Sequence, residues 1–391
     1  MPRRIASLLH TRSRRSRVRS ASPRFRPLQA VTAALAVGAV LLGVLPAAAT
    51  NGTVWTTLPS TPTVRWGLAA AAAPCPVGQT GTCVYGVGGN SGGTSTGTTE
   101  SYNRLTNAWS TLSPLSVPRR RLAAAAAPCP VGQSGTCVYS LGGLNTADAT
   151  VGTAESYNPA SNAWSTLPAM PTPRSILAST AGPCPLGQTG TCVYAIGGNN
   201  GTTNVATVQS YNPATNAWST LAPLSAPRIF LAAAAAPCPA GQSGTCVYAT
   251  GGDNGSGRVA TVESYNPATN AWSPVASLPG PRADLAAAAA PCPVGQSGTC
   301  VYAVGGSAPG ATGAVESYNP ASNVWTTLPS MPTPRFALGA ATTTCPPGQT
   351  GTCVYAVGGV VAGGASTGAL EALDPPPAPS DDSGPTRSAL P

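Results

Sequence analysis

The most regular reactive groups in this 391-residue chain are its twelve cysteines. They fall into six pairs with seven residues between the two thiols: Cys75 with Cys83, Cys129 with Cys137, Cys184 with Cys192, Cys238 with Cys246, Cys292 with Cys300, and Cys345 with Cys353. An even number of regularly paired cysteines in an exported chain predicts disulfides. Metal clips are the alternative, but each pair offers only two sulfurs, whereas a structural zinc site needs four ligands. We therefore expect six disulfides, no metal and no cofactor.

Groups suited to acid, base or nucleophilic catalysis are scarce. The only histidine, His10, lies in the N-terminal segment, and the chain contains no lysine. The remainder of the chain therefore has no means of forming a histidine-based triad, a histidine-rich metal site or a Schiff base.

Carboxylates are present, but most of them recur at one position of a repeat. They are Glu100, Glu155, Glu263, Glu316 and Glu371, with Gln209 in the third copy. A residue that recurs in nearly every copy is expected to have a structural role. Asp148, Asp253 and Asp284 are more individual, but the sequence places no two carboxylates at the roughly 5–9 Å that glycoside hydrolysis requires. We expect no catalytic residues, with a carboxylate-dependent enzyme of the lyase or epimerase type as the alternative.

Tryptophans mark an internal repeat. Six of them are 54, 55, 54, 54 and 53 residues apart: Trp55, Trp109, Trp164, Trp218, Trp272 and Trp325. A period near 50 residues is typical of one supersecondary unit repeated along the chain, as in solenoids and propellers. The 45 glycines and 42 prolines recur with the same period, so they indicate turns rather than disorder.

Each copy predicts four strands. In the second copy these are 122–127, 137–143, 153–158 and 162–167. The first contains five consecutive alanines and has a high helix propensity, but a segment this short between prolines is not a self-supporting helix. We interpret it as the innermost strand, where small side chains let neighbouring units converge. The other three contain alternating or β-forming residues, and an Asn-Pro turn joins the last two.

Further features recur in every copy or nearly so. Gly-Gly doublets lie at 88–89, 142–143, 197–198, 251–252, 305–306 and 358–359, and in most copies a tyrosine precedes the tryptophan by seven residues. An arginine opens each inner strand: Arg65, Arg119, Arg174, Arg228, Arg282 and Arg335. Over about 52–374 this pattern resembles the Kelch signature. The resemblance implies an all-β, six-bladed propeller of four-stranded blades. The arginines are expected to bond backbone and tie blades together, although a ring of them could also attract an anion.

The two ends of the repeat region complement each other. The first copy begins at Trp55 with no tyrosine strand before it, and the last copy ends at 367–374 with no tryptophan strand after it. We therefore expect Val54–Leu58 to complete the C-terminal blade, which removes the open edges of the sheet. Leu373 stands where most other copies have tyrosine. This composite blade is predicted to be the least regular and the first to open.

The basic excess of the chain belongs to its N-terminal segment. Residues 1–49 contain nine arginines and no acid, so the remainder has 20 − 9 = 11 arginines against 11 acids. This balance argues against a nucleic-acid partner. A basic stretch, an apolar stretch at about 30–45 and Ala47-Ala48-Ala49 predict a signal peptide over 1–49. The alternatives are twin-arginine export and an uncleaved membrane anchor.

After cleavage we expect a propeller at 50–374, a disordered Pro-rich tail at 375–391 and no stable membrane span. The predicted location is secreted, extracellular or in the cell envelope.

Function is expected on the face where the copies differ. The loops after each Gly-Gly vary in every copy, as do the two residues after each repeat arginine, whereas the loops at 75–83 and its equivalents barely change. Loops on a rigid scaffold commonly carry binding sites, and aromatic and arginine side chains dominate interface energetics. The expected anchors are Trp66, Arg120, Arg121, Phe230, Asp284 and Phe336.

The predicted function is that of a non-catalytic binding or scaffold protein, which presents its variable loops on one face of the propeller. Its expected partner is an extracellular protein or glycan, and the protein is expected to be a monomer. A purely structural role in the cell envelope and unconstrained drift of the loops are the alternatives.

The exported protein is predicted to begin at Thr50, directly after the small-residue site. N-terminal sequencing or intact-mass measurement of the secreted material checks this. Retention of residues 1–49 on a membrane-bound form would contradict it.

Overall fold

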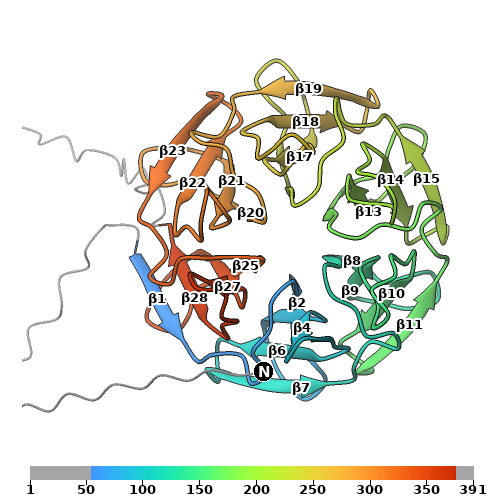
Figure 1. The fold of residues 1–391 in the computed structure, drawn as a ribbon, viewed down its shortest axis with the longest axis vertical. Coiled ribbons are helices and arrows are strands. Elements are labelled where there is room, and N and C mark those ends of the chain that lie inside the picture. The colour runs from blue at the N-terminus through green and yellow to red at the C-terminus, as the bar shows by residue number, and fades with distance from the viewer. Residues whose placement is uncertain (1–53, 376–391) are drawn as a thin grey trace, which may run out of the picture. The chain divides into compact units, whose positions relative to one another are not determined.

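A computed structural model describes residues 54–375 of the chain. These residues form six antiparallel four-stranded sheets, arranged as blades around a central axis (Figure 1). The prediction of an all-β, six-bladed propeller is confirmed. The predicted leader and nearly all of the predicted tail lie outside the described residues. Within 54–375, no helix is long and apolar enough to cross a membrane.

Corresponding strands have nearly the same length in every blade. The innermost strands are β2 (Ala69–Pro74), β8 (Ala123–Pro128), β12 (Ala178–Pro183), β16 (Ala232–Pro237), β20 (Ala286–Pro291) and β25 (Gly339–Thr344). The second strands are β3 (Thr82–Val87), β9 (Thr136–Leu141), β13 (Thr191–Ile196), β17 (Thr245–Thr250), β21 (Thr299–Val304) and β26 (Thr352–Val357). The third strands are β6 (Thr99–Asn103), β10 (Ala154–Asn158), β14 (Val208–Asn212), β18 (Val262–Asn266), β22 (Val315–Asn319) and β28 (Leu370–Asp374).

The outer strands carry the repeat tryptophans. They are β7 (Ala108–Leu112), β11 (Ala163–Leu167), β15 (Ala217–Leu221), β19 (Ala271–Val275), β23 (Val324–Leu328) and β1 (Val54–Leu58). Two short ribbons extend the loops of one face: β4 (Asn90–Ser91) pairs with β5 (Thr94–Ser95), and β24 (Arg335–Phe336) pairs with β27 (Val360–Val361). We number the blades 1 to 6 by their inner strands, from β2 to β25.

Alanine forms strands here because the inner strands converge on the axis. In β2 the side chains alternate between buried and half-buried positions, as the period of a strand requires. Half-buried Ala70 and Ala72 pack against the cluster at the junction with blade 6. The middle residues of all six inner strands line a central channel of about 220 Å³. A larger side chain would crowd this channel or the next blade, so tertiary packing overrides the helix propensity of alanine.

Six disulfides close the hairpins between the first and second strands, which confirms the predicted pairing within each copy. They join Cys75 to Cys83, Cys129 to Cys137, Cys184 to Cys192, Cys238 to Cys246, Cys292 to Cys300, and Cys345 to Cys353. The Cα atoms of each pair lie 4.7–4.8 Å apart. Each bridge closes a short loop, for which the chain-entropy model gives about 2–3 kcal/mol. This contribution offsets the small apolar area that the alanine strands bury.

Aromatic side chains fill the spaces between blades. Tyr102 packs against Trp109 of its own blade, with ring centroids 5.6 Å apart, and against Tyr355 of blade 6 at 6.4 Å. The tyrosine hydroxyl donates to the Asn107 side chain at 2.6 Å, and burial raises the pKa of Tyr102 to about 12. The Trp109 indole donates to the Pro59 carbonyl, just beyond the outer strand of blade 6, at 2.7 Å. The outer strands are thus linked from blade to blade.

The chain ends close the ring as predicted. Strand β1 pairs with β28 along its whole length, with Trp55 opposite Leu373 (Figure 1). The Trp55 indole donates to the Pro329 carbonyl at 2.8 Å, so blade 6 is tied to blade 5 in the same way as the other neighbours. Leu373 is buried, but it supplies neither the hydroxyl nor the ring that the tyrosine supplies elsewhere.

Blade 6 is expected to open first for two reasons. No turn connects its outer strand β1 to its third strand β28, and it lacks the Tyr–Asn and Tyr–Trp contacts of the other blades. Hydrogen exchange followed by mass spectrometry should show the earliest subglobal exchange in β1 and β28. Earlier exchange in the third and fourth strands of any other blade would contradict this.

Candidate binding site

The recurrent arginines lie inside the blades and have a structural role. Arg119 is fully buried, and its guanidinium donates to the carbonyls of Gly142 and Thr153, both at 2.8 Å. It also pairs with Glu155 on the third strand of the same blade. Burial lowers the pKa of Arg119, and the Glu155 carboxylate opposes that shift. The equivalent pairs are Arg65–Glu100, Arg174–Gln209, Arg228–Glu263, Arg282–Glu316 and Arg335–Glu371.

The backbone of the same arginine fastens its blade to the preceding one. The Gly89 N–H donates to the Arg119 carbonyl at 2.8 Å. Gly88 has a φ of 61°, and a Cβ on it would lie 2.6 Å from that carbonyl oxygen. Both conditions require glycine, which explains the Gly-Gly doublet. The other bonds of this kind run from Gly143 to Arg174, Gly198 to Arg228, Gly252 to Arg282, Gly306 to Arg335 and Gly359 to Arg65.

Two residues after each arginine, the chain forms a closed ring around the axis. The N–H of each ring residue donates to the carbonyl of the ring residue in the preceding blade, over distances of 2.8–3.2 Å. All six have φ between 53° and 59°. We call them the mouth ring: Gly67, Arg121, Ile176, Phe230, Asp284 and Ala337. Positive φ is unfavourable for β-branched Ile176 and bulky Phe230, so the surrounding packing must impose it.

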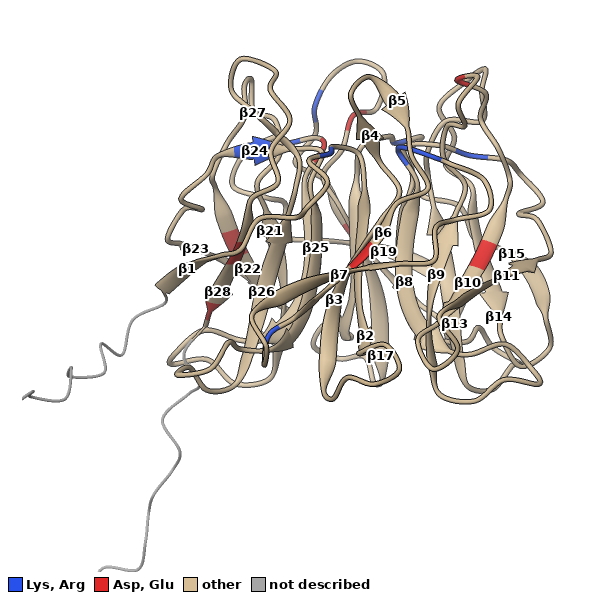
Figure 2. Ribbon diagram, turned by 90° about the horizontal axis from the view of Figure 1, so that it is seen from below, with Lys and Arg blue, Asp and Glu red and all other residues tan. Residues whose placement is uncertain are grey.

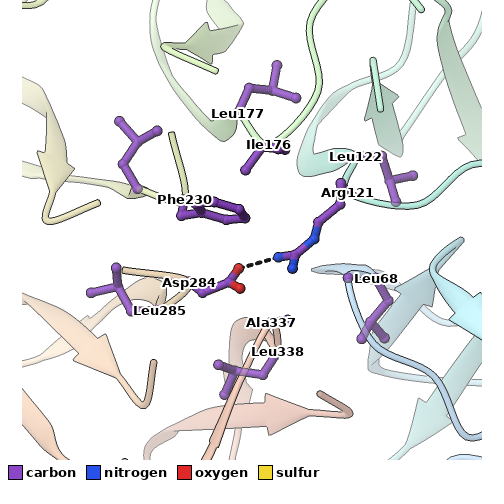
Figure 3. Close-up of a pocket in the computed structure, with 12 residues that line it drawn as sticks. Leu68, Arg121, Leu122, Ile176, Leu177, Phe230, Asp284, Leu285, Ala337 and Leu338 are labelled. Atoms are coloured by element: carbon purple, nitrogen blue, oxygen red, sulfur yellow. Dashed lines mark hydrogen bonds and ion pairs between the residues drawn. The ribbon is translucent and has the colours of Figure 1, made fainter. Parts of the chain in front are cut away.

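Four of the predicted anchors meet at this ring. The Arg121 guanidinium carbon lies 4.8 Å from the centroids of both the Trp66 and the Phe230 rings. Its Nη1 also pairs with the Asp284 carboxylate across the axis (Figure 3). The Arg121 and Asp284 side chains are each 16% exposed, so the pair is accessible although largely desolvated. Charge, aromatic faces and shape are therefore combined at one small opening.

The surroundings of Asp284 in the mouth ring shift its pKa. Burial raises the pKa of the Asp284 carboxyl above its usual 3.8, and Arg121 opposes this shift. The carboxylate is thus held at the mouth mainly by its one arginine partner.

The other two predicted anchors lie away from this cluster. Arg120 pairs with exposed Asp148 at 2.6 Å and donates to the Ser95 hydroxyl at 3.0 Å, which braces the loops of blades 1 and 2. Phe336 is half-buried in β24 and pairs with β27. They are loop-bracing positions on the same face.

The sequence reasoning did not select Ile176 as an anchor, nor did it anticipate the hydrogen-bonded ring. The ring could have been recognised in the sequence as the second position after each repeat arginine, because this position forms the ring in all six copies.

The two faces of the propeller differ as expected. Figure 2 shows most of the arginines near the end that carries β4, β5, β24 and β27. At the opposite end the unvarying loops bond one another: the Val77 N–H donates to the Pro159 carbonyl of blade 2 at 3.0 Å. Gln79 donates to Ser110 at 3.0 Å within blade 1. The constant loops thus contribute hydrogen bonds between neighbouring blades.

Among the described residues, one cluster of cysteines and acids has spacing compatible with a metal ion: Cys345, Cys353 and Asp374. The two sulfurs are bonded to each other in a disulfide. They are therefore not thiolate ligands in this oxidised form.

The fold is a six-bladed propeller with one disulfide in each blade, and the mouth ring is its candidate binding site. The chain belongs to the Kelch family: the Kelch motif model matches residues 71–116, 125–171, 182–225, 234–279 and 288–332. Kelch propellers typically act as protein-binding scaffolds.

Several curated proteins are similar to this chain. Kelch-like protein 25 of Xenopus tropicalis is 27% identical over 206 residues, which cover 50% of this chain and 31% of that protein. Kelch-like protein 35 of Mus musculus is 31% identical over 184 residues, covering 47% and 28%. Kelch-like protein terF of Aspergillus terreus is 27% identical over 297 residues, covering 71% and 58%. The chain thus spans less than two thirds of the length of each of these relatives.

A solved structure supports the fold alone. The structure of YjhT superposes with a TM-score of 0.55 at 15% sequence identity, and the match covers 79% of this chain and 95% of that chain.

Arg121→Ala should raise the pKa of Asp284 further, because it removes the charge that opposes burial. The folded-state pKa would then lie well above the unfolded-state value near 3.8. The variant should be most stable below that value and lose stability as the pH rises through the folded-state pKa. Carboxyl NMR titration and thermal melts across this pH range check the prediction. An unchanged or lower pKa in the variant would show that the ion pair does not control Asp284.

Proposed function

We propose that this protein is an exported, monomeric and non-catalytic binding protein that takes a protein or glycan ligand at its mouth ring. The observation that carries the proposal is the Arg121 cluster. One guanidinium lies between the rings of Trp66 and Phe230 and pairs with Asp284, at the centre of the face whose loops differ in every blade.

The chemistry of the cluster suits recognition. Aromatic and arginine side chains are the residues that most often dominate binding energy, particularly at the partly desolvated centre of an interface. The backbone ring holds their Cα atoms in place before a ligand arrives, so little conformational entropy is lost on binding. The surrounding loops are rich in Gly, Thr and Asn, which suits hydrogen bonding to a peptide or to sugar hydroxyls.

Two observations support export, and a third supports the absence of catalysis. Six disulfides persist only in an oxidising compartment, and the N-terminal segment has the composition of a signal peptide. The mouth lining contains a single carboxylate, Asp284, which is already paired with Arg121. Catalysis by a pair of carboxylates, one as acid and one as base, would need a second carboxylate in this lining. An enzyme of lyase or epimerase type remains the alternative, and a turnover assay with Asp253→Asn and Asp284→Asn separates it from binding.

A glycan array and a pull-down from secreted proteins, both with the oxidised mature protein, test the proposal. Trp66→Ala and Phe230→Ala should each weaken capture at least about tenfold, which is about 1.4 kcal/mol. Both variants should fold, because the chain itself has Ala283 and Ala337 at the corresponding positions of other blades. Leu186→Ala is the matched control, since Leu186 is 76% exposed on the opposite face. Equal loss in the control, or full retention in both mouth variants, would refute binding at the mouth.

A further inference from the structure

A second candidate site lies between the variable loops of blades 4 and 5. It is a groove of about 570 Å³. Its lining residues are Arg258, Gly280, Pro281, Arg282, Ala308, Pro309, Thr312, Ala314 and Glu316. We call it the blade 4–5 groove. None of these residues lines the mouth ring, so the groove is a separate site on the same face.

Comparison of the blades shows what is unusual about this groove. In blade 1, Glu100 uses one carboxylate oxygen for Arg65 and the other, Oε1, for Thr63. The Thr63 N–H and hydroxyl donate to Oε1 at 3.1 and 2.7 Å. In blade 6, the Thr333 hydroxyl donates to the equivalent oxygen of Glu371 at 2.6 Å. The segment before the repeat arginine therefore supplies the donors to Oε1 of the glutamate in its own blade.

The same role is filled by different residues in blades 2, 3 and 4. In blade 2 the N–H of Ser116 donates to Glu155 at 3.0 Å, and its hydroxyl also donates. In blade 4 the Ser225 N–H donates to Glu263 at 3.2 Å. In blade 3 the Gln209 amide, which replaces glutamate, donates to the Thr172 hydroxyl at 3.4 Å. Five of the six blades thus provide an internal partner.

Blade 5 lacks this partner. The corresponding residues are Pro279, which has no N–H, and Gly280, which has no hydroxyl. Arg282 pairs with Oε2 of Glu316, and within 54–375 no hydrogen bond reaches Oε1. The Glu316 side chain is still nine-tenths buried, with 9% exposed. Burial raises the pKa of this carboxyl, and Arg282 opposes the shift. Oε1 is not one of the fully buried unpaired atoms among the described residues, so it is accessible from the groove that Glu316 lines, where a ligand can donate to it.

We propose that the blade 4–5 groove binds an extended peptide of a partner protein through a threonine or serine residue, whose N–H and hydroxyl donate to Oε1 of Glu316. The ligand would supply from outside the two donors that Thr63 supplies within blade 1. Pro281 and Pro309 offer apolar surface to the residues on either side. The Arg258 guanidinium is held at the rim by Ser307 at 3.0 Å and is exposed, so it can donate to a peptide carbonyl.

Isothermal titration of the oxidised mature protein with Ac-Pro-Thr-Pro-NH2 tests the proposal directly. Ac-Pro-Val-Pro-NH2 is the matched control, because valine has the shape of threonine without the hydroxyl. The threonine peptide should bind about tenfold more tightly, as expected for a hydrogen bond to a charged group. Equal affinities, or no binding of the threonine peptide at millimolar concentration, would overturn the proposal.

Two variants locate the binding. Gly280→Thr restores the internal donor of blades 1 and 6, and an added Cβ meets no atom within 4 Å, so the variant should fold and lose threonine-peptide binding. Glu316→Gln recreates the Arg174–Gln209 pair of blade 3 and should weaken binding about tenfold by removing the charge. Wild-type affinity in Gly280→Thr would overturn the assignment. Arg121→Ala should leave peptide binding unchanged, whereas Gly280→Thr should leave capture at the mouth unchanged, so the two proposals fail separately.

Discussion

The structure depends on the contact between the carbonyl of a buried arginine in one blade and the Gly-Gly doublet of the blade before it. This backbone hydrogen bond occurs at all six junctions, including the one between Gly359 and Arg65 that closes the circle. The approach is too close for a Cβ on the first glycine. Inside its own blade the arginine pairs with glutamate, or with Gln209 in blade 3. One residue thus connects the interior of a blade to its neighbour. A Cβ on the first glycine of the doublet would collide with that carbonyl oxygen, so glycine is required for the two blades to approach this closely.

Around these junctions the propeller compensates for a sparse interior. Alanine strands converge on the axis and bury little apolar area, so a large share of the packing comes from tyrosine and tryptophan between the outer parts of the blades. The disulfides restrict the unfolded chain at each inner hairpin. Local stability is therefore distributed almost evenly around the ring. Blade 6 is the exception, because two distant chain segments assemble it and Leu373 replaces the tyrosine.

The blades differ from one another at positions where the repeat constrains the backbone but not the side chain. The mouth ring constrains backbone rather than side chains, so glycine, arginine, isoleucine, phenylalanine, aspartate and alanine all occupy equivalent positions. Equivalent backbones with different side chains convert a near-symmetric ring into one asymmetric surface. The blade 4–5 groove arises in the same way, since Pro279 and Gly280 occupy a position that supplies a donor elsewhere. In both places a departure from the repeat makes one part of the variable face unlike the rest.

Most of the fold was predictable from the sequence, because its signals are local and occur several times over. The cysteine spacing predicts hairpin disulfides, the glycine doublets and tryptophans predict the blades, and the unmatched ends at Trp55 and Leu373 predict ring closure. The anchors could be selected only as variable positions next to a repeat arginine. That Arg121 meets Asp284, 163 residues away, was decided by the tertiary structure, because closure into six blades sets blades 2 and 5 on opposite sides of one axis. The Glu316 oxygen without a protein donor likewise emerges only in three dimensions. The sequence does not reveal that residues before the repeat arginine donate to the carboxylate of the third strand.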